Sequence, residues 1–418
     1  MPDKQAVLLI HGIGEQRPMD TLRGFVKAVW TTDKNVQHPH ARPGVFSKPD
    51  DISDSFELRR LTTTSDRNNV RTDFFEFYWA HLMEGTAIRH VLTWAFRLLF
   101  RWPWNVPRQL RAAWFLIVMT LLIAATFVAL TVVPEEHQPM ALPKWLTVML
   151  GLLTTWLIVP IINSFVGDVA RYLDPAPANI KRRQEIRAEG IKVLKKLHDS
   201  GEYQRIIVVG HSLGTVIGYD ILTYAWPAFA QKETANPQPH PKLDAIEEAV
   251  AEQSLDKYRA MQRELLTELQ ASGCKWLVSD FVTLGSPLTH AEVLLARDLD
   301  DLKSKQQERE LPTCPPVLEK DKFSFPAERK HRTLHHAAVF GPTRWANLYF
   351  PSCYVIRGDL VGGPLADVFG KGILDCPVAT SLRRGFFSHT LYWSMETEEN
   401  PGTHVAALRT ALNVLDAA

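Results

Sequence analysis

The stretch Arg205-Ile206-Ile207-Val208-Val209-Gly210-His211-Ser212-Leu213-Gly214 decides how this chain folds. Its first half is an apolar, β-branched run that predicts a buried parallel strand. Residues 215–222 predict a helix, so the Gly-His-Ser-Leu-Gly pentapeptide makes a sharp turn between strand and helix. In so tight a turn the central residue is held in a strained backbone conformation, and side chains at Gly210 and Gly214 would collide. We therefore expect the Ser212 hydroxyl to stand above a sheet as a candidate nucleophile.

The composition excludes several classes of protein. The chain has 418 residues, 46% of them hydrophobic, and a formal net charge of +1, so nothing in it indicates nucleic acid as a partner. The cysteines (Cys274, Cys314, Cys353 and Cys376) are widely spaced, which favours reduced thiols over a disulfide framework or a zinc site. Residues 1–5 lead directly into a strand-like run at 6–10, so we expect no cleaved signal peptide.

Two long uncharged runs predict membrane spans. Residues 112–133 and 145–166 are each about 22 residues long, and about 20 apolar residues cross the hydrocarbon core as a helix. Tryptophans lie near their ends, at Trp114 and Trp145, as is typical of the membrane interface. The alternative is a pair of deeply buried core helices. Pro160 is expected to kink the second helix.

The residues that flank these runs predict the orientation of the hairpin. Basic residues precede the first run and follow the second, whereas the loop at 134–143 carries Glu135 and Glu136 and no lysine or arginine. Because positive residues stay inside, we expect both flanks in the cytoplasm and the loop outside. The protein is thus predicted to be a two-pass protein of the inner or cytoplasmic membrane. Residues 86–104 mix basic and aromatic side chains, which fits an interfacial helix or, equally, an amphipathic helix packed on the soluble domain.

The first strand ends in a glycine-rich turn, His11-Gly12-Ile13-Gly14. Backbone N–H groups in such a turn can stabilise negative charge on a reacting carbonyl oxygen without a side chain in the way. We expect one donor at Ile13 or Gly14, a turn glycine at Gly12, and a second donor at Leu213, directly after the candidate nucleophile.

Together, the HGIG strand end, the GHSLG turn and the later strand at 280–288 resemble the α/β-hydrolase superfamily, in its lipase- and esterase-like branch. The resemblance covers residues 5 to about 15 and 190–413, but not the predicted hairpin. It implies a mostly parallel sheet flanked by helices, and a catalytic triad in the chain order Ser, acid, His.

The acid that the resemblance implies should follow a strand. Residues 351–357 read as that strand and 358–363 as the loop beyond it, so Asp359 is the first candidate, with Asp367 and Asp375 as alternatives. An aspartate there would hold the imidazole of the base in the correct tautomer.

The base should lie on a loop between the acid and a C-terminal helix at 403–415, and His389 fits this position. His404 is the competitor, but its polar surroundings at a helix start predict a surface histidine. Ser286 ends a strand without a turn of the Ser212 kind, so we expect it to pack or cap.

A histidine cluster (His331, His335 and His336) has a helical i, i+4 spacing, but no carboxylate or cysteine supports a metal site there. We therefore expect no metal and no organic cofactor. Residues 231–242 read as a loop and 243–272 as one charged helix, which is either a lid or a solvated surface helix. Residues 298–332 are expected to form an exposed excursion.

These patterns predict an α/β-hydrolase domain formed by residues 1–85 and 171–418, with the membrane segment 86–170 inserted between them. The favoured function is a serine hydrolase that cleaves a carboxylic ester of a lipid or other lipophilic acyl substrate beside the bilayer. Two alternatives stay open: an acyltransferase or an amide or thioester hydrolase with the same triad, and a catalytically silent membrane scaffold. The oligomeric state is not predicted.

Overall fold

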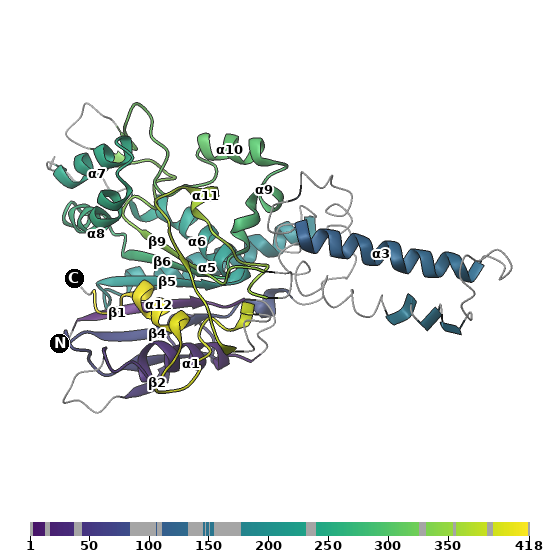
Figure 1. Ribbon diagram of the computed structural model, residues 1–418. Coiled ribbons are helices and arrows are strands. Elements are labelled where there is room, and N and C mark those ends of the chain that lie inside the picture. Colours follow the sequence, from purple (N-terminus) through teal and green to yellow (C-terminus); the bar gives the residue numbers. More distant parts are fainter. Residues whose placement is uncertain are drawn as a thin grey trace. The chain divides into compact units, whose positions relative to one another are not determined.

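The computed structural model describes residues 3–12, 17–36, 44–83, 106, 111–132, 145–146, 148–149, 151–153, 177–230, 240–325, 332–353, 357–382 and 388–416 (Figure 1). The chain divides into two compact units. Unit 1 comprises Met1–Glu84, Arg182–Pro351 and Ile356–Ala418, and unit 2 comprises Gly85–Lys181 and Ser352–Val355.

Unit 1 is built on an eight-stranded, mostly parallel sheet with the strand order β10-β9-β6-β5-β1-β4-β3-β2. Only β3 runs against its neighbours, and every pairing from β4 to β10 is parallel. The strands of the sheet are β1 (Lys4–Ile10), β2 (Val45–Pro49), β3 (Arg59–Thr63), β4 (Arg71–Phe77), β5 (Arg205–His211), β6 (Val278–Leu284), β9 (Arg344–Tyr349) and β10 (Leu374–Pro377); β7 (Ser324–Phe325) and β8 (Thr333–Leu334) pair separately.

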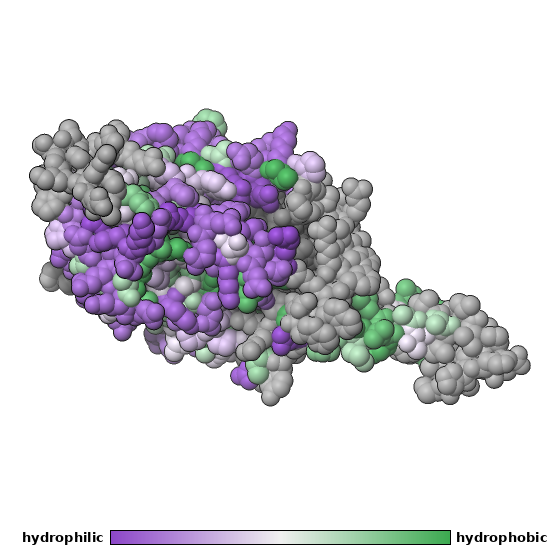
Figure 2. All heavy atoms as spheres, turned by 90° about the horizontal axis from the view of Figure 1, so that it is seen from above, coloured by the Kyte–Doolittle hydropathy of each residue, from purple (hydrophilic) through white to green (hydrophobic). Residues whose placement is uncertain are grey.

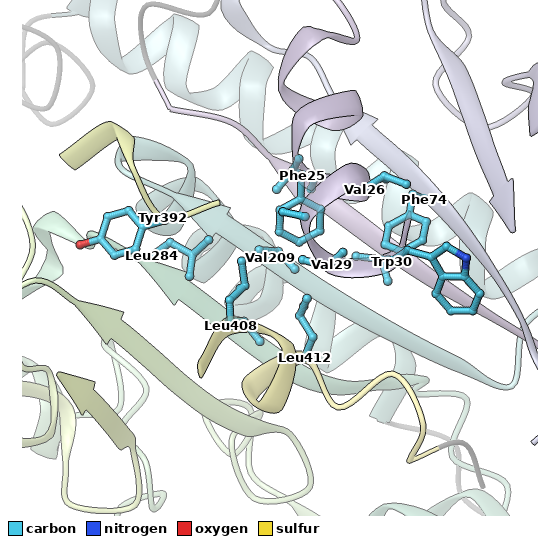
Figure 3. Close-up of a cluster of buried hydrophobic side chains, with 14 of the residues drawn as sticks. Phe25, Val26, Val29, Trp30, Phe74, Val209, Leu284, Tyr392, Leu408 and Leu412 are labelled. Carbon is cyan, nitrogen blue, oxygen red and sulfur yellow. The ribbon is translucent and has the colours of Figure 1, made fainter. Parts of the chain in front are cut away.

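Helices cover both faces of this sheet, which explains why β1 and β5 each contain a continuous apolar run, at residues 6–10 and 206–209. Every residue of β5 is buried. One face holds the cluster drawn in Figure 3, where Phe25 and Leu408 lie over Val209 of β5. On the other face, Tyr219 stacks its ring against Phe340.

The described helical elements are α1 (Asp20–Val26), η1 (Lys27–Thr31), η2 (Ala80–Met83), α3 (Arg111–Val132), α5 (Pro177–Asp199), α6 (Leu213–Ala230), α7 (Pro241–Ala251), α8 (Leu255–Ala271), η5 (Pro287–His290), α9 (Ala291–Leu294), α10 (Leu299–Gln307), α11 (Ala366–Phe369), η7 (Ser388–Thr390) and α12 (Thr403–Leu412). The strands expected at 6–10, 205–209 and 280–288 correspond to β1, β5 and β6, although β6 ends at Leu284 and Pro287–His290 form η5. The α/β class with a mostly parallel sheet is therefore confirmed.

Three local predictions were wrong. The strand expected at 351–357 has no counterpart in its described residues, 351–353 and 357, and residues 354–356 lie outside the described part of the chain. The strand that precedes Asp359 is β9, which pairs with β6, buries Trp345 against Phe281 and ends at Tyr349. The single helix expected at 243–272 is two helices, interrupted where Gln253 takes a φ of 56°. The excursion at 298–332 is not wholly exposed, since it contains α10 and buries Leu302.

Side chains of helix α8 donate hydrogen bonds to backbone carbonyls that lie just before strands β9 and β10. The Tyr258 hydroxyl donates to the carbonyl of Phe340, and Gln262 Nε2 donates to the carbonyl of Thr343 (2.9 Å), directly before β9. Arg259 Nε donates to the carbonyl of Gly372 (3.0 Å), just before β10. Because Ser212 follows the opposite end of β5, these contacts favour a covering surface helix over a lid.

In unit 2 the main described element is α3, which begins at Arg111 and coincides with the first uncharged run except for residue 133. Several of its apolar side chains are exposed, including Phe115, Met119 and Leu122 at 51%, 54% and 56%. Within the described part of the chain, no helix is found to be long and apolar enough to cross a membrane. The interfacial helix expected at 86–104 and most of the second run at 145–166 lie outside the described residues.

Candidate active site

Ser212 occupies the turn between β5, which ends at His211, and α6, which begins at Leu213. Its φ is +53°, in the left-handed region that residues other than glycine rarely adopt. A conformation of this kind costs about 1–3 kcal/mol and persists only where the surroundings enforce it. The turn therefore has the strained backbone that the sequence pattern predicted.

The glycines on either side allow this turn to pack closely. A Cβ at Gly210 would lie 2.6 Å from Cα of Thr215, in the first turn of α6. A Cβ at Gly214 would lie 2.6 Å from the carbonyl oxygen of His11 and closer still to that of Ile10. Neither position has room for a side chain, because the neighbouring atoms belong to the backbone.

The structure brings Ser212, His389 and Asp359 into one chain of hydrogen bonds. His389 Nε2 lies 2.8 Å from Ser212 Oγ, and His389 Nδ1 lies 2.9 Å from Asp359 Oδ2. With the proton on Nδ1, the imidazole donates to the carboxylate and accepts from the serine hydroxyl. These three residues are separated by up to 177 positions and meet beyond the carboxyl ends of the strands.

Asp359 is buried with 1% of its surface exposed, and its carboxylate is well supplied with donors. The amide of Val361 donates to Oδ1 (2.8 Å), and the Tyr392 hydroxyl donates to Oδ2 (2.7 Å). Burial by itself raises the pKa of Asp359, but the charge of His389 and hydrogen bonds from His389, Tyr392 and the amide of Gly362 outweigh it and hold the pKa at about 2. The acid is therefore ionised, as a group that orients an imidazole must be.

Two further glycines make room for this carboxylate. Gly285, at the end of β6, has a φ of +60°, and a Cβ there would lie 2.7 Å from Asp359 Oδ2. A Cβ at Gly362 would lie 2.5 Å from Cα of Gly285 and 2.8 Å from the same oxygen. This role of Gly285 and Gly362 was not predicted from the sequence, although a glycine directly after a buried strand is a visible signal.

The surroundings of the predicted oxyanion hole are described only in part. Leu213 is buried and begins α6 directly after Ser212, but Ile13 and Gly14 lie outside the described residues. Gly12 is described, and a Cβ there would lie 2.8 Å from Ser212 Cβ. The chain leaving β1 therefore passes directly beside Ser212.

Two residues beside the triad were not predicted from the sequence. His211 is buried, with its Nε2 2.9 Å from the carbonyl oxygen of His389, and burial followed by the charge of His389 lowers its pKa to about 3. A neutral His211 with its proton on Nε2 donates to that carbonyl and holds the loop. Tyr392 follows His389 by three positions, and burial and then Asp359 raise the pKa of its phenol.

The two alternative acids, Asp367 and Asp375, interact with other groups. Asp367 is exposed and forms an ion pair with Lys371. Asp375 accepts from the backbone amides of Leu365 (3.0 Å) and Ala366 (2.9 Å) at the start of α11. Neither is bonded to the imidazole of the triad in the described structure.

His404 is not a surface histidine, so that prediction is wrong. Its side chain is buried, its Nε2 lies 2.8 Å from the carbonyl oxygen of Ser394, and its ring lies near that of Phe350. The polar residues around His404 predicted exposure, but this end of α12 packs onto the core and buries the imidazole. Ser286 is also buried and bonded, with its Oγ 2.7 Å from Thr215 Oγ1.

The histidine cluster does not form a helical face. His335 follows the short strand β8, its Nε2 lies 3.2 Å from the carbonyl oxygen of Val317, and its Nδ1 accepts from the amide of Ala337. His331 lies outside the described residues. Among the residues that are described, no group of three or more histidine, cysteine or acidic side chains could hold a metal ion.

No family model, curated protein or solved structure matches this chain. The fold and the site alone therefore define its class. It is an α/β protein with a mostly parallel sheet, and it carries a hydrogen-bonded Ser-His-Asp chain beyond the carboxyl ends of the strands.

Proposed function

We propose that this protein is a serine hydrolase of the α/β-hydrolase type that cleaves a carboxylic ester through an acyl-enzyme. The observation that carries the proposal is the pair of hydrogen bonds that link Ser212 Oγ through His389 to Asp359. The strained turn at Ser212, the chain order Ser, Asp, His and the mostly parallel sheet support it. Chance rarely places three such side chains, each positioned by a different loop, in one connected line.

The proposed mechanism follows from the bonding of these groups. Ser212 Oγ attacks the acyl carbonyl while His389 Nε2 takes its proton, and the carbonyl oxygen becomes an oxyanion. The amide of Leu213 and an amide of the Ile13–Gly14 turn are the proposed donors to that oxygen. Collapse breaks the ester bond, and His389 returns the proton to the departing alcohol. Water, deprotonated by His389, then attacks the acyl-enzyme and releases the acid and free Ser212.

Labelling with a fluorophosphonate probe tests this proposal. Such probes phosphonylate an activated serine, so we expect stoichiometric labelling of the wild type and none of Ser212→Ala. Ser286→Ala is the matched control, because its hydroxyl is bonded to Thr215 and the amide of Leu288, and it should keep its label. Equal labelling of wild type and Ser212→Ala, or no labelling of either, would refute the proposal.

We further propose that residues 86–170 attach the protein to a membrane as a helical hairpin, with its catalytic domain on the cytoplasmic side. The uncharged runs in the sequence and the exposed apolar side chains of α3 support this. In Figure 2 the described part of α3 is mainly green, whereas the visible surface of unit 1 is mainly purple. A site held beside a bilayer suits a lipophilic ester as substrate.

Vesicle flotation tests the attachment. The full chain should float with phosphatidylcholine vesicles and resist washing with high salt or carbonate. The double variant Met119→Arg and Leu122→Arg should lose most of this binding, because each arginine costs about 2–4 kcal/mol in hydrocarbon. Leu374→Arg, at a comparably exposed apolar residue of unit 1 (47%), should float normally. Loss of the wild type from vesicles in the salt wash would contradict the proposal, and cytoplasmic accessibility of a tag in 134–143 would reverse the orientation.

A further inference from the structure

Unit 1 contains a cavity of about 430 Å³ at the amino ends of the central strands, the end of the sheet opposite Ser212. It lies where β1 and β5 begin, and Lys4, Gln204 and Arg205 line it there. Helix α8 contributes Arg263, Thr267 and Gln270, whose spacing of four and three places them on one face of the helix. The volume falls within the range of roughly 300–1,000 Å³ that is usual for small-molecule sites.

The carboxylates of Asp280 and Asp416, which lie close to Arg205 of this cavity, each form an ion pair with an arginine. Arg205, itself 1% exposed, donates from Nη2 to Asp280 Oδ2 (2.6 Å) and from Nη1 to the carbonyl of Asp416 (2.9 Å). Arg344 donates to the other oxygen of Asp280 (2.8 Å) and to Asp416 Oδ2 (2.8 Å). The two carboxylates thus neutralise two guanidinium groups.

Arg263 is the third guanidinium, and it has no carboxylate of its own among the residues that the structure describes. Its hydrogen bond there is a long one, from Nη2 to the carbonyl oxygen of Asp416 (3.4 Å). Partial burial, followed by the charge of Arg205, lowers its pKa, which means that its positive charge is destabilised where it lies. A half-buried guanidinium without a counter-ion is a recognition group for an oxyanion, since its fork of donors matches a carboxylate or phosphate.

We propose that this cavity is a binding site for a small oxyanion, a carboxylate or phosphate group, paired with the guanidinium of Arg263. Lys4 lies at the same cavity but is already bonded to Glu202 (2.6 Å), so Arg263 supplies the charge. Val70 and Leu277 form an apolar part of the wall, which suits the carbon skeleton of an organic acid or phosphate ester. This site is distinct from the proposed catalytic site and does not depend on it.

Thermal unfolding and calorimetric titration of the full chain in detergent micelles test the site. Inorganic phosphate and succinate, each titrated at an ionic strength held constant with sodium chloride, separate phosphate from carboxylate preference. We expect at least one of them to raise the unfolding midpoint and to bind saturably. Arg263→Gln should weaken that binding at least tenfold, and Arg263→Lys should retain part of it.

The control is Lys257→Gln, which removes the same charge from an exposed position of α8. It should bind the anion as the wild type does. Arg263→Gln should also unfold no earlier than the wild type without anion, because it removes a half-buried positive charge that pairs with no carboxylate in the part of the chain that is described. Absence of saturable binding by both anions, or equal binding by wild type and Arg263→Gln, would overturn the proposal.

Discussion

Replacing Asp359 by asparagine is expected to lower the turnover of an activated ester by roughly 10⁴-fold with little change in the fold. The amide NH₂ of asparagine would face His389 Nδ1 and donate to it, so the imidazole would carry its proton on Nε2. That nitrogen could then no longer accept the proton of Ser212 Oγ, from which it lies 2.8 Å away. Steady-state hydrolysis of a nitrophenyl ester, compared with the wild type, measures the loss.

Tyr392→Phe is expected to reduce the same activity by a smaller factor than Asp359→Asn does. It removes one of the hydrogen bonds to Asp359 Oδ2 and leaves that of His389 Nδ1, so we expect a loss of about tenfold, the effect of one hydrogen bond to a charged group. Activity of Asp359→Asn within tenfold of the wild type would show that this carboxylate does not orient the base.

The low pKa of Asp359 allows a prediction of how activity and stability depend on pH. The carboxylate is held at about 2, below the ordinary aspartate value, so it stays ionised throughout the mildly acidic range. A fall in activity between pH 7 and 5 must therefore come from another group. The stability that ionised Asp359 contributes is present above its ordinary pKa and is lost only as the pH falls towards 2.

Gly214→Ala is expected to destabilise the protein by about 3 kcal/mol or more and to abolish labelling of Ser212. The new methyl group would overlap the carbonyl oxygens of Ile10 and His11, which belong to the backbone and cannot rotate away. Strand β1 and helix α6 would have to separate, which displaces the turn between them. Thermal unfolding should show a midpoint several degrees lower than that of the wild type.

The matched control is Gly24→Ala, in α1. A Cβ there would meet no heavy atom nearer than Trp393 Nε1 at 3.4 Å, an ordinary contact. Alanine also favours a helix over glycine by about 1 kcal/mol, so this variant should be as stable as the wild type or slightly more so. Equal midpoints for the two variants would mean that the turn tolerates a side chain at Gly214.

Local sequence was sufficient where short-range geometry decides the structure. The apolar run before Gly210 predicted β5, and the glycines around Ser212 predicted a turn that admits no side chains, because both depend on neighbouring residues only. His389 could be chosen because it lies between the expected acid and a C-terminal helix, whereas the strand before Asp359 was misplaced at 351–357. The first strand, with its Gly12 turn, was similarly readable from its own residues.

Features that depend on residues far apart in the chain could not be predicted from local sequence and emerged with the assembled fold. It buried His404, because the polar residues beside it say nothing about the core on which α12 packs. It brought Gly285 and Gly362 together to hold Asp359, and within the described residues it paired Arg205 and Arg344 with carboxylates but not Arg263. Hydrophobic periodicity determines which residues form strands and helices, but burial and charge pairing are properties of the assembled sheet. For that reason the α/β elements and the candidate nucleophile Ser212 could be predicted from the sequence. The packing around Asp359 depends on long-range contacts and could be seen only in the folded chain.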